Sequence, residues 1–235
     1  MLLKPTNILL INKKVVSLCF EATTGLDISV FRKVLLQHFP SLEEVTHSFD
    51  RVNLLFKSPI EEETILKKIA QLDWNQLKRE QPTYYWEIPI CFNEQYPNDL
   101  AQIFQGDKNA IDHYRTVFLS ATYRLEFYGF LPGFGYLSGL PKQCHLDRKL
   151  TANRKTLKGT VAVGGEQVGV YPQDSPGGWQ AIGYSPLPWI QAKQAPYVFI
   201  QPGEAIRFVT VDLQECKAIA KGIETGHYQP KKVLL

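Results

Sequence analysis

The stretch that most constrains how this chain can fold runs over residues 164–186. It holds six glycines and three prolines among aromatic and uncharged polar residues. Glycine allows backbone angles and close approaches that other residues forbid, and proline fixes the course of turns. We therefore expect a short buried strand over residues 168–171, a turn over 175–178 and a second strand over 179–183.

This arrangement would place three side chains, together with backbone N–H groups, on one concave wall. They are Ser175, Gln180 and Trp179. Hydroxyl, amide and backbone donors of this kind can bind the oxygen atoms of a small ligand. The alternative is a tight β-hairpin in which the glycines serve packing alone. The sequence leaves both interpretations open.

A second glycine–aromatic stretch covers residues 128–141. Its four aromatic rings are separated by glycine and proline, so a regular element of this length cannot bury all of them. Such rings either line a pocket or form a surface for a partner. The spacing is not that of a phosphate-binding loop. No G-x-x-x-x-G-K-[ST] run is present, and Gly133-x-Gly135 lacks the third glycine of the dinucleotide pattern.

The composition indicates an ordinary soluble globular protein. The 235 residues are 44% hydrophobic and 21% charged, which suits one large or two small domains with a full core. The formal net charge of +3, without a Lys/Arg tract, does not favour a nucleic-acid surface. No apolar run approaches the roughly 18 residues of a membrane span, and the first residues do not resemble a signal peptide. The four cysteines are widely separated, which predicts reduced thiols in a cytoplasmic protein.

The first third of the chain alternates strands with two helices. β-Branched and aromatic residues favour strands, and apolar residues at helical spacing favour helices. We expect strands at 6–11, 15–20, 45–49 and 52–56, and helices at 26–39 and 60–72. This pattern predicts a small α/β sandwich with both helices on one face of the sheet. A polar linker before Tyr84 divides the chain into domains 1–83 and 84–235.

The remainder of the chain consists mainly of strands with a few helices, so the whole is of the α+β class. Strands are expected at 84–92, 123–127, 195–200 and 205–211, and helices after Asn98 and at 109–120. Asp212 followed by Glu215 is a capping-box pattern that begins a last helix. Residues 227–235 are a tail or an edge strand.

Three motifs resemble those of a known family. They lie at residues 130–137, 167–172 and 175–183, and they look like motifs of the B subunit of 5-oxoprolinase. That family is also known as allophanate hydrolase subunit 1, and it includes the sporulation-kinase inhibitor of bacilli. It is similar to one half of the carboxyltransferase domain of urea carboxylase. The match covers about residues 88–211, while the first third carries no diagnostic motif.

The resemblance implies a small N-terminal α/β domain followed by a cyclophilin-like β-barrel domain. It also implies a cytoplasmic protein that works with the C and A subunits of a 5-oxoprolinase complex. Such complexes use ATP to cleave 5-oxoproline to glutamate, so ATP is expected at the level of the complex. A related reading is a component of the allophanate hydrolase or urea amidolyase type. Two further alternatives are a non-catalytic inhibitor of a histidine kinase and a ligand-binding module without turnover.

Two family positions differ in this sequence. The family's Thr-Pro-Arg and Val-Pro-Ala-Gly-Ser-Val segment corresponds to residues 151–161, where the arginine is displaced by one position and both prolines are lost. The family's Ile-Gly-Arg-Thr-Pro corresponds to residues 182–186, where tyrosine replaces the arginine. Either cation could meet an anionic substrate, and Arg154 or Lys158 is available as a substitute. The departures bear on the substrate more than on the fold.

No complete catalytic constellation is visible, and the catalytic residues are unknown. Ser175 lies in Asp-Ser-Pro-Gly and not in the G-x-S-x-G of a hydrolase nucleophile. Cys144 and His145 are adjacent, whereas catalytic Cys–His pairs are usually distant in sequence. No clustered histidines and cysteines predict a metal site. His113 falls near the apolar side of its helix, where it is either a core residue or a ligand-binding residue.

The sequence hypothesis is an aromatic-lined pocket, formed by the two glycine–aromatic stretches, for a small amide or carboxylate. Arg124 or Arg154 would supply positive charge, and backbone N–H groups, Ser175 and Gln180 would bind oxygen atoms. The predicted substrate-binding residues are His113, Arg124, Phe130, Gly133, Phe134, Tyr136, Arg154, Tyr171, Ser175, Gly177, Gly178, Trp179 and Gln180.

Overall fold

A computed structural model describes residues 4–21, 26–77, 80–151, 155–191 and 195–235. The chain divides into two compact units, Met1–Gln81 and Pro82–Leu235. This division lies two residues from the boundary that the sequence predicts after residue 83. Each unit carries its own hydrophobic core.

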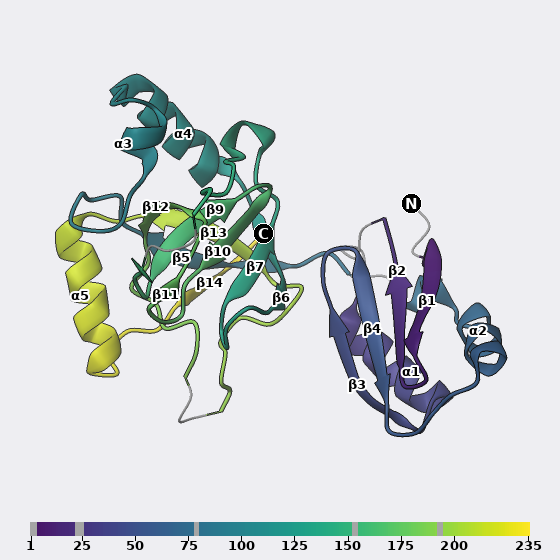
Figure 1. Ribbon diagram of the computed structural model, residues 1–235. Helices are drawn as coiled ribbons and strands as arrows, with labels where there is room; N and C mark the ends of the chain where they lie inside the picture. The colour runs from purple at the N-terminus through teal and green to yellow at the C-terminus, as the bar shows by residue number, and fades with distance from the viewer. Residues whose placement is uncertain (1–3, 22–25, 78–79, 152–154, 192–194) are drawn as a thin grey trace. The chain divides into compact units, whose positions relative to one another are not determined.

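The first unit is a four-stranded antiparallel sheet covered by helices (Figure 1). Its elements are β1 (Asn7–Asn12), β2 (Val15–Cys19), α1 (Ile28–His38), β3 (Leu42–His47), β4 (Arg51–Phe56), α2 (Glu62–Ala70) and the 3-10 turn η1 (Trp74–Leu77), with strand order β1-β2-β4-β3. Alternate residues of the central strands, such as Val16 and Leu54, pack in one cluster with Phe31 of α1 and Ile65 of α2. The predicted placement of both helices on one face is therefore confirmed.

The second unit is built on an eight-stranded mixed sheet. Its strands, in sheet order, are β12 (Gln180–Tyr184), β9 (Thr160–Gly164), β10 (Gln167–Val170), β7 (Gly135–Ser138), β6 (Tyr123–Tyr128), β13 (Ala205–Thr210), β5 (Tyr84–Ile90) and β14 (Lys231–Leu234). A two-residue pair, β8 (Lys155–Thr156) with β11 (Ser175–Pro176), lies beside them. The helices are α3 (Leu100–Ile103), α4 (Lys108–Ser120), η2 (Lys142–Cys144) and α5 (Leu213–Glu224). In Figure 1, α3 and α4 lie together and α5 lies apart from them. The mixture of helices and sheets confirms the α+β class.

The large sheet curls around its core until its first strand, β12, meets the residue that follows β5, the last strand but one. Cys91, just after β5, and Tyr184, at the end of β12, exchange backbone hydrogen bonds of 2.8 and 2.9 Å. This contact is an isolated bridge and not a ladder. Among the described residues the expected barrel is therefore a strongly curled sheet in which the edge strand β12 touches the end of β5 at one residue pair.

The stretch that opened the sequence analysis does not form a hairpin. Two strands within it, β10 and β12, both pair with β9, on opposite sides of that strand. The segment between them includes Ser175 and Pro176, which pair with β8 as β11 and do not form a simple turn. The alternative of a tight hairpin is thus wrong, because β9 takes the place between the two strands.

Two other expectations concern the end of the chain. The strand expected at 195–200 is absent, since these residues form bends without a ladder partner; proline at position 196 removes a backbone donor that a ladder would need. The capping box is confirmed, because Glu215 N–H donates to Asp212 Oδ1 at 2.8 Å and Asp212 N–H donates to Glu215 Oε2 at 3.0 Å. No described helix is both long and apolar enough to span a bilayer.

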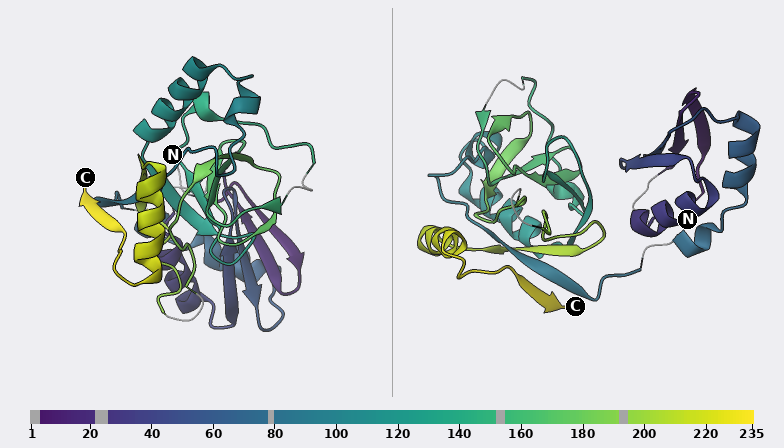
Figure 2. Two further views of the ribbon diagram at one scale, coloured as in Figure 1. Left: turned by 90° about the vertical axis from the view of Figure 1, so that its left-hand side faces the viewer. Right: turned by 90° about the horizontal axis from the view of Figure 1, so that it is seen from below.

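The last strand, β14, runs along the outer edge of β5 (Figure 2). Four side chains hold β14 against β5. We call these residues, Tyr84, Trp86, Glu204 and Lys232, the edge cluster. The Glu204 carboxylate accepts hydrogen bonds from the Tyr84 hydroxyl, from Trp86 Nε1 at 2.8 Å and from the Gln201 N–H at 2.7 Å. Lys232 Nζ lies 3.3 Å from the same carboxylate and 4.0 and 4.5 Å from the Tyr84 and Trp86 ring centroids. Every charged group of this cluster has a partner.

Candidate functional site

The two glycine–aromatic stretches meet on the outer face of the large sheet. We call the sheet surface beneath them the floor. It consists of four residues that are neighbours across successive strands: Tyr136 of β7, Gly169 of β10, Ala162 of β9 and Ala181 of β12. The neighbours of Ala162 along β9, Val161 and Val163, belong to the main core inside the sheet. Because side chains alternate along a strand, the small residues are left on the opposite face, where they make room for large rings.

Rings from both stretches fill this floor, and we call Phe130, Phe134, Tyr136, Tyr171 and Trp179 the aromatic cluster. Phe134 meets Trp179 edge-on, with ring centroids 5.4 Å apart and an interplanar angle of 84°. It meets Tyr171 in the same manner at 5.2 Å, and Tyr136 lies 5.8 Å from Trp179. Such edge-to-face pairs are the favourable geometry for aromatic rings. The prediction that the two stretches come together is confirmed, although their own rings fill the space that we expected to be open.

The packing of these rings requires glycine at two positions of the stretch 164–186. A Cβ atom at Gly169 would collide with the Phe134 ring, and one at Gly164 would lie 2.5 Å from the Trp179 ring. Both glycines therefore serve packing in this fold. Gly133 is also constrained, because its φ of +85° favours glycine and a Cβ atom would lie 2.6 Å from Ile190.

The outer side of the aromatic cluster remains accessible. Phe134, Tyr171 and Trp179 are buried, Tyr136 is half-buried, and Phe130 is 61% exposed. Phe130 also has a φ of +64°, a strained value for a residue with a Cβ atom. Backbone strain of this kind is concentrated at functional sites. The exposed ring is therefore the part of the cluster best placed to touch a ligand or a partner.

Several polar groups border the rings. Burial raises the pKa of the Tyr171 hydroxyl, and hydrogen bonds from Thr156 and from the Trp179 N–H partly offset that rise. Ser175 is buried, and within the described residues its Oγ has no hydrogen-bond partner. Gly177 lies against the Tyr171 hydroxyl and Thr156, where a Cβ atom would not fit. Ser175 is thus one of the buried hydroxyls, together with Thr160 on β9, that have unused hydrogen-bonding capacity among the described residues.

Gln180 and Gly178 hold a neighbouring loop. Gln180 Nε2 donates to the Asp147 carbonyl at 2.9 Å, and the Lys149 N–H donates to the Gly178 carbonyl at 2.7 Å. These predicted ligand-binding residues therefore serve as anchors for residues 147–149. Between those two anchor points lies Arg148.

Arg148 is a cation that the sequence analysis did not select. Its exposed guanidinium lies 5.4 Å from the centroid of the Trp179 ring. It is also close enough to the Tyr136 hydroxyl to oppose the rise in pKa that burial causes there. Nothing in the local sequence distinguishes Arg148, because its position over Trp179 depends on the contacts of residues 147–149 with residues 178–180.

The remaining predicted site residues lie elsewhere or are not described. His113 is exposed on α4, so it is not a core residue. Arg124, half-buried on β6, stands opposite Ser138 and Ala205 in the sheet register. Arg154 lies outside the described residues.

Cys144 and His145 do not form a nucleophilic pair. Burial raises the pKa of the Cys144 thiol to about 11, which disfavours the reactive thiolate. A ring nitrogen of His145, Nε2, lies 3.2 Å from the Leu140 carbonyl. Among the described residues no group of three or more His, Cys, Asp or Glu side chains could hold a metal ion.

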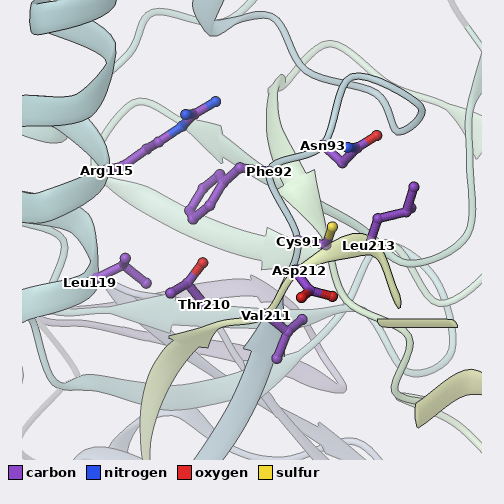
Figure 3. Close-up of a pocket in the computed structure, with 9 residues that line it drawn as sticks. All are labelled: Cys91, Phe92, Asn93, Arg115, Leu119, Thr210, Val211, Asp212 and Leu213. Carbon is purple, nitrogen blue, oxygen red and sulfur yellow. The ribbon is translucent and has the colours of Figure 1, made fainter. Parts of the chain in front are cut away.

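A separate hollow of about 370 Å³ opens at the carboxyl ends of the parallel strands β5 and β13 (Figure 3). Its lining includes Phe92, Arg115 and Asp212, and none of the predicted site residues contributes to it. The charged groups of the hollow have partners among the described residues, except that the buried Arg115 Nε has none. The Arg115 guanidinium lies over Phe92 and near Asp112, and the Asp212 carboxylate caps α5. This leaves the aromatic cluster as the candidate functional site.

A comparison with known protein families identifies the family of this chain. The model of the carboxyltransferase domain, subdomains C and D, matches residues 10–200. The chain belongs to this family. The expectation from the three motifs is thereby confirmed, and the match extends well into the first unit, where no motif was visible.

Relatives of known name agree with this assignment. A protein of Escherichia coli O157:H7, named as the B subunit of 5-oxoprolinase, is 30% identical over 181 residues, covering 74% of this chain and 80% of the relative. A Bacillus subtilis (strain 168) protein of the same name is 28% identical over 200 residues, covering 85% and 78%. The crystal structure of Kluyveromyces lactis urea carboxylase aligns with a TM-score of 0.68 at 15% identity, over 94% of this chain. The alignment spans only 23% of that longer protein, and at this identity it shows the fold alone.

Proposed function

We propose that this chain is the B subunit of a cytoplasmic ATP-dependent 5-oxoprolinase complex that cleaves 5-oxo-L-proline to L-glutamate. The supporting observation is that the two motif-bearing stretches, far apart in sequence, come together in the aromatic cluster. The names of the relatives point to the same complex. ATP is required at the level of the complex, whose other members are the C and A subunits.

The groups at the aromatic cluster suit the chemistry of opening a lactam ring. Opening a lactam ring with ATP requires activation of the amide oxygen and stabilisation of the charge that develops on it. Hydrogen-bond donors next to an apolar wall suit that task, and the Ser175 hydroxyl and the exposed Phe130 ring are groups of these kinds. A site that lies open on one side is suited to completion by a partner protein. We therefore place the site shared with the C subunit over the aromatic cluster.

The test is reconstitution from the purified A, B and C subunits. We expect glutamate release from 5-oxoproline only when all three proteins and ATP are present. A verified complex of all three that released no glutamate would overturn the proposal. If that complex instead hydrolysed allophanate, or a urea-derived amide, the activity of the urea amidolyase type would take its place.

A matched pair of variants tests the location. Phe130 and Tyr197 are both exposed aromatic residues, at 61% and 60%. Phe130→Ala should lower complex formation or glutamate release about tenfold or more, because it removes an apolar contact from the shared site. Tyr197→Ala, at a different loop, should leave both unchanged. Equal behaviour of the two variants would argue against a shared site at the aromatic cluster.

A further inference from the structure

The aromatic cluster holds a cation in a fixed position without a counter-charge. The Arg148 guanidinium lies over the Trp179 ring, 5.4 Å from its centroid, and the side chain is exposed. Within the described residues no carboxylate forms an ion pair with it. A guanidinium carries five donors in a planar fork that matches a carboxylate. Most of the hydrogen-bonding capacity of Arg148 is therefore available to a ligand.

The backbone on both sides of Arg148 is anchored. The Asp147 carbonyl accepts from Gln180 Nε2, and the Lys149 N–H donates to the Gly178 carbonyl. Lys149 Nζ is also paired with the buried Asp99 carboxylate, which accepts from the Ala181 N–H at 2.7 Å. Residues 147 and 149 are thus tied to residues 178–181, directly through Gln180 and Gly178 and indirectly through Asp99. A cation held this way needs little reorganisation when an anion binds, which favours affinity.

Other arginines on aromatic rings in this unit are already hydrogen-bonded to protein acceptors. Arg207 lies 4.4 Å from the Tyr85 ring centroid, and its Nε donates to Thr122 Oγ1 at 2.8 Å. Arg115 lies over Phe92 and approaches the Asp112 carboxylate at 3.4 Å. Arg148 differs in having no such acceptor among the described residues, so its place over the ring is not explained by a structural hydrogen bond.

We propose that Arg148 forms a carboxylate-binding subsite on the aromatic cluster. Its ligand is a small cyclic amide that carries a carboxylate, with the guanidinium binding the carboxylate in bidentate fashion and the aromatic rings contacting the ring of the ligand. This subsite rests on the proposed function for the identity of the substrate.

The experiment compares two lactams that differ only in the carboxylate, 5-oxoproline and 2-pyrrolidinone. In the reconstituted complex, Arg148→Ala should raise KM for 5-oxoproline about tenfold to a hundredfold, the range for losing a hydrogen-bonded charge pair. Turnover of 2-pyrrolidinone should not change, and Arg148→Lys should recover part of the loss. Arg207→Ala is the matched control, since it also removes an arginine from an aromatic ring, and it should leave KM unchanged.

A binding measurement on the full chain separates this proposal from the proposed function. The indole N–H resonance of Trp179, assigned with Trp179→Phe, should shift on addition of 5-oxoproline but much less with 2-pyrrolidinone. Arg148→Ala should abolish the difference. Equal shifts with both lactams, or an unchanged KM in Arg148→Ala, would overturn the subsite. A complex that binds 5-oxoproline through Arg148 but releases no glutamate would overturn the proposed function and leave the subsite standing.

Discussion

The edge cluster and the aromatic cluster each have a cation over aromatic rings, but among the described residues only the cation at the edge cluster is paired with a carboxylate. In the edge cluster, Lys232 lies against the rings of Tyr84 and Trp86, and the Glu204 carboxylate pairs with it. In the aromatic cluster, Arg148 lies over Trp179 and has no such carboxylate among the described residues. A cation on aromatic rings is therefore not by itself a functional signal.

The difference teaches how to separate a structural cluster from a ligand site. Burial alone would raise the pKa of Glu204, but hydrogen bonds from Tyr84, the Gln201 N–H and Trp86, together with the Lys232 charge, hold that pKa below its ordinary value. These contacts stabilise the fold, and they pair the Lys232 charge with a carboxylate. At Arg148 the donors are unused, so removing that side chain should affect binding more than stability.

The largest effect is expected from filling the floor of the aromatic cluster. Gly169→Val should lower the free energy of unfolding by about 3 kcal/mol, because its side chain would collide with Phe134 in a packed region. Gln167→Val, in the same strand, should change it by less than about 1 kcal/mol. Urea unfolding measures both. Equal stability of the two variants would mean that the rings can move away, and that the cluster is not rigid.

The second-largest loss of stability is expected when the Glu204 carboxylate is removed. Glu204→Ala should cost about 2 kcal/mol, because it leaves Tyr84, Trp86 and Lys232 without their shared acceptor. The exposed Glu166→Ala serves as the control and should stay within about 0.5 kcal/mol of wild type. The KM for 5-oxoproline should not change in Glu204→Ala. A raised KM would contradict the assignment of the edge cluster to structure.

The pH dependence should come from the same carboxylate. A pKa that is lower in the folded than in the unfolded state contributes stability above the unfolded value and loses it as the pH falls through the folded value. The stability difference between wild type and Glu204→Ala should therefore be full at pH 7 and shrink below about pH 4. Urea midpoints measured between pH 7 and pH 3 test this expectation. A difference that persisted or grew in acid would show that the lowered pKa of Glu204 does not contribute to folding.

The smallest effect on stability is expected at the candidate site itself. Arg148→Ala should cost less than about 1 kcal/mol, the usual contribution of an exposed cation over a ring. Thermal and urea unfolding of this variant should be close to wild type even though its KM is raised. A loss as large as that of Glu204→Ala would remove the distinction between the two clusters and assign Arg148 to the fold.

The parts of this protein that could be predicted depend on neighbouring residues. The Asp212–Glu215 capping box, the helices of the first unit and strand β5 follow from residues a few positions apart. Those features depend on backbone donors, helical periodicity and side-chain shape, which act over short distances. The family motifs also identified the two stretches that meet in the aromatic cluster.

The parts that could not be predicted depend on which strands become neighbours. Strand β9 separates β10 from β12, so the stretch from Val170 to Gln180 crosses over another strand instead of turning back in a hairpin. The rings then pack into one another, because Gly169 and Ala162 leave a floor for them on the outer face of the sheet.

The amino-acid sequence by itself determined the fold class, the position of the helices in the first unit and the segments from which the site is built. Only the tertiary structure decided that Arg148 stands over Trp179, that Lys232 is neutralised by Glu204, and that the rings leave no open space between Phe134 and Trp179. The physical reason is that local propensities act along the chain, whereas a charge acquires or lacks a partner only when distant segments are brought together.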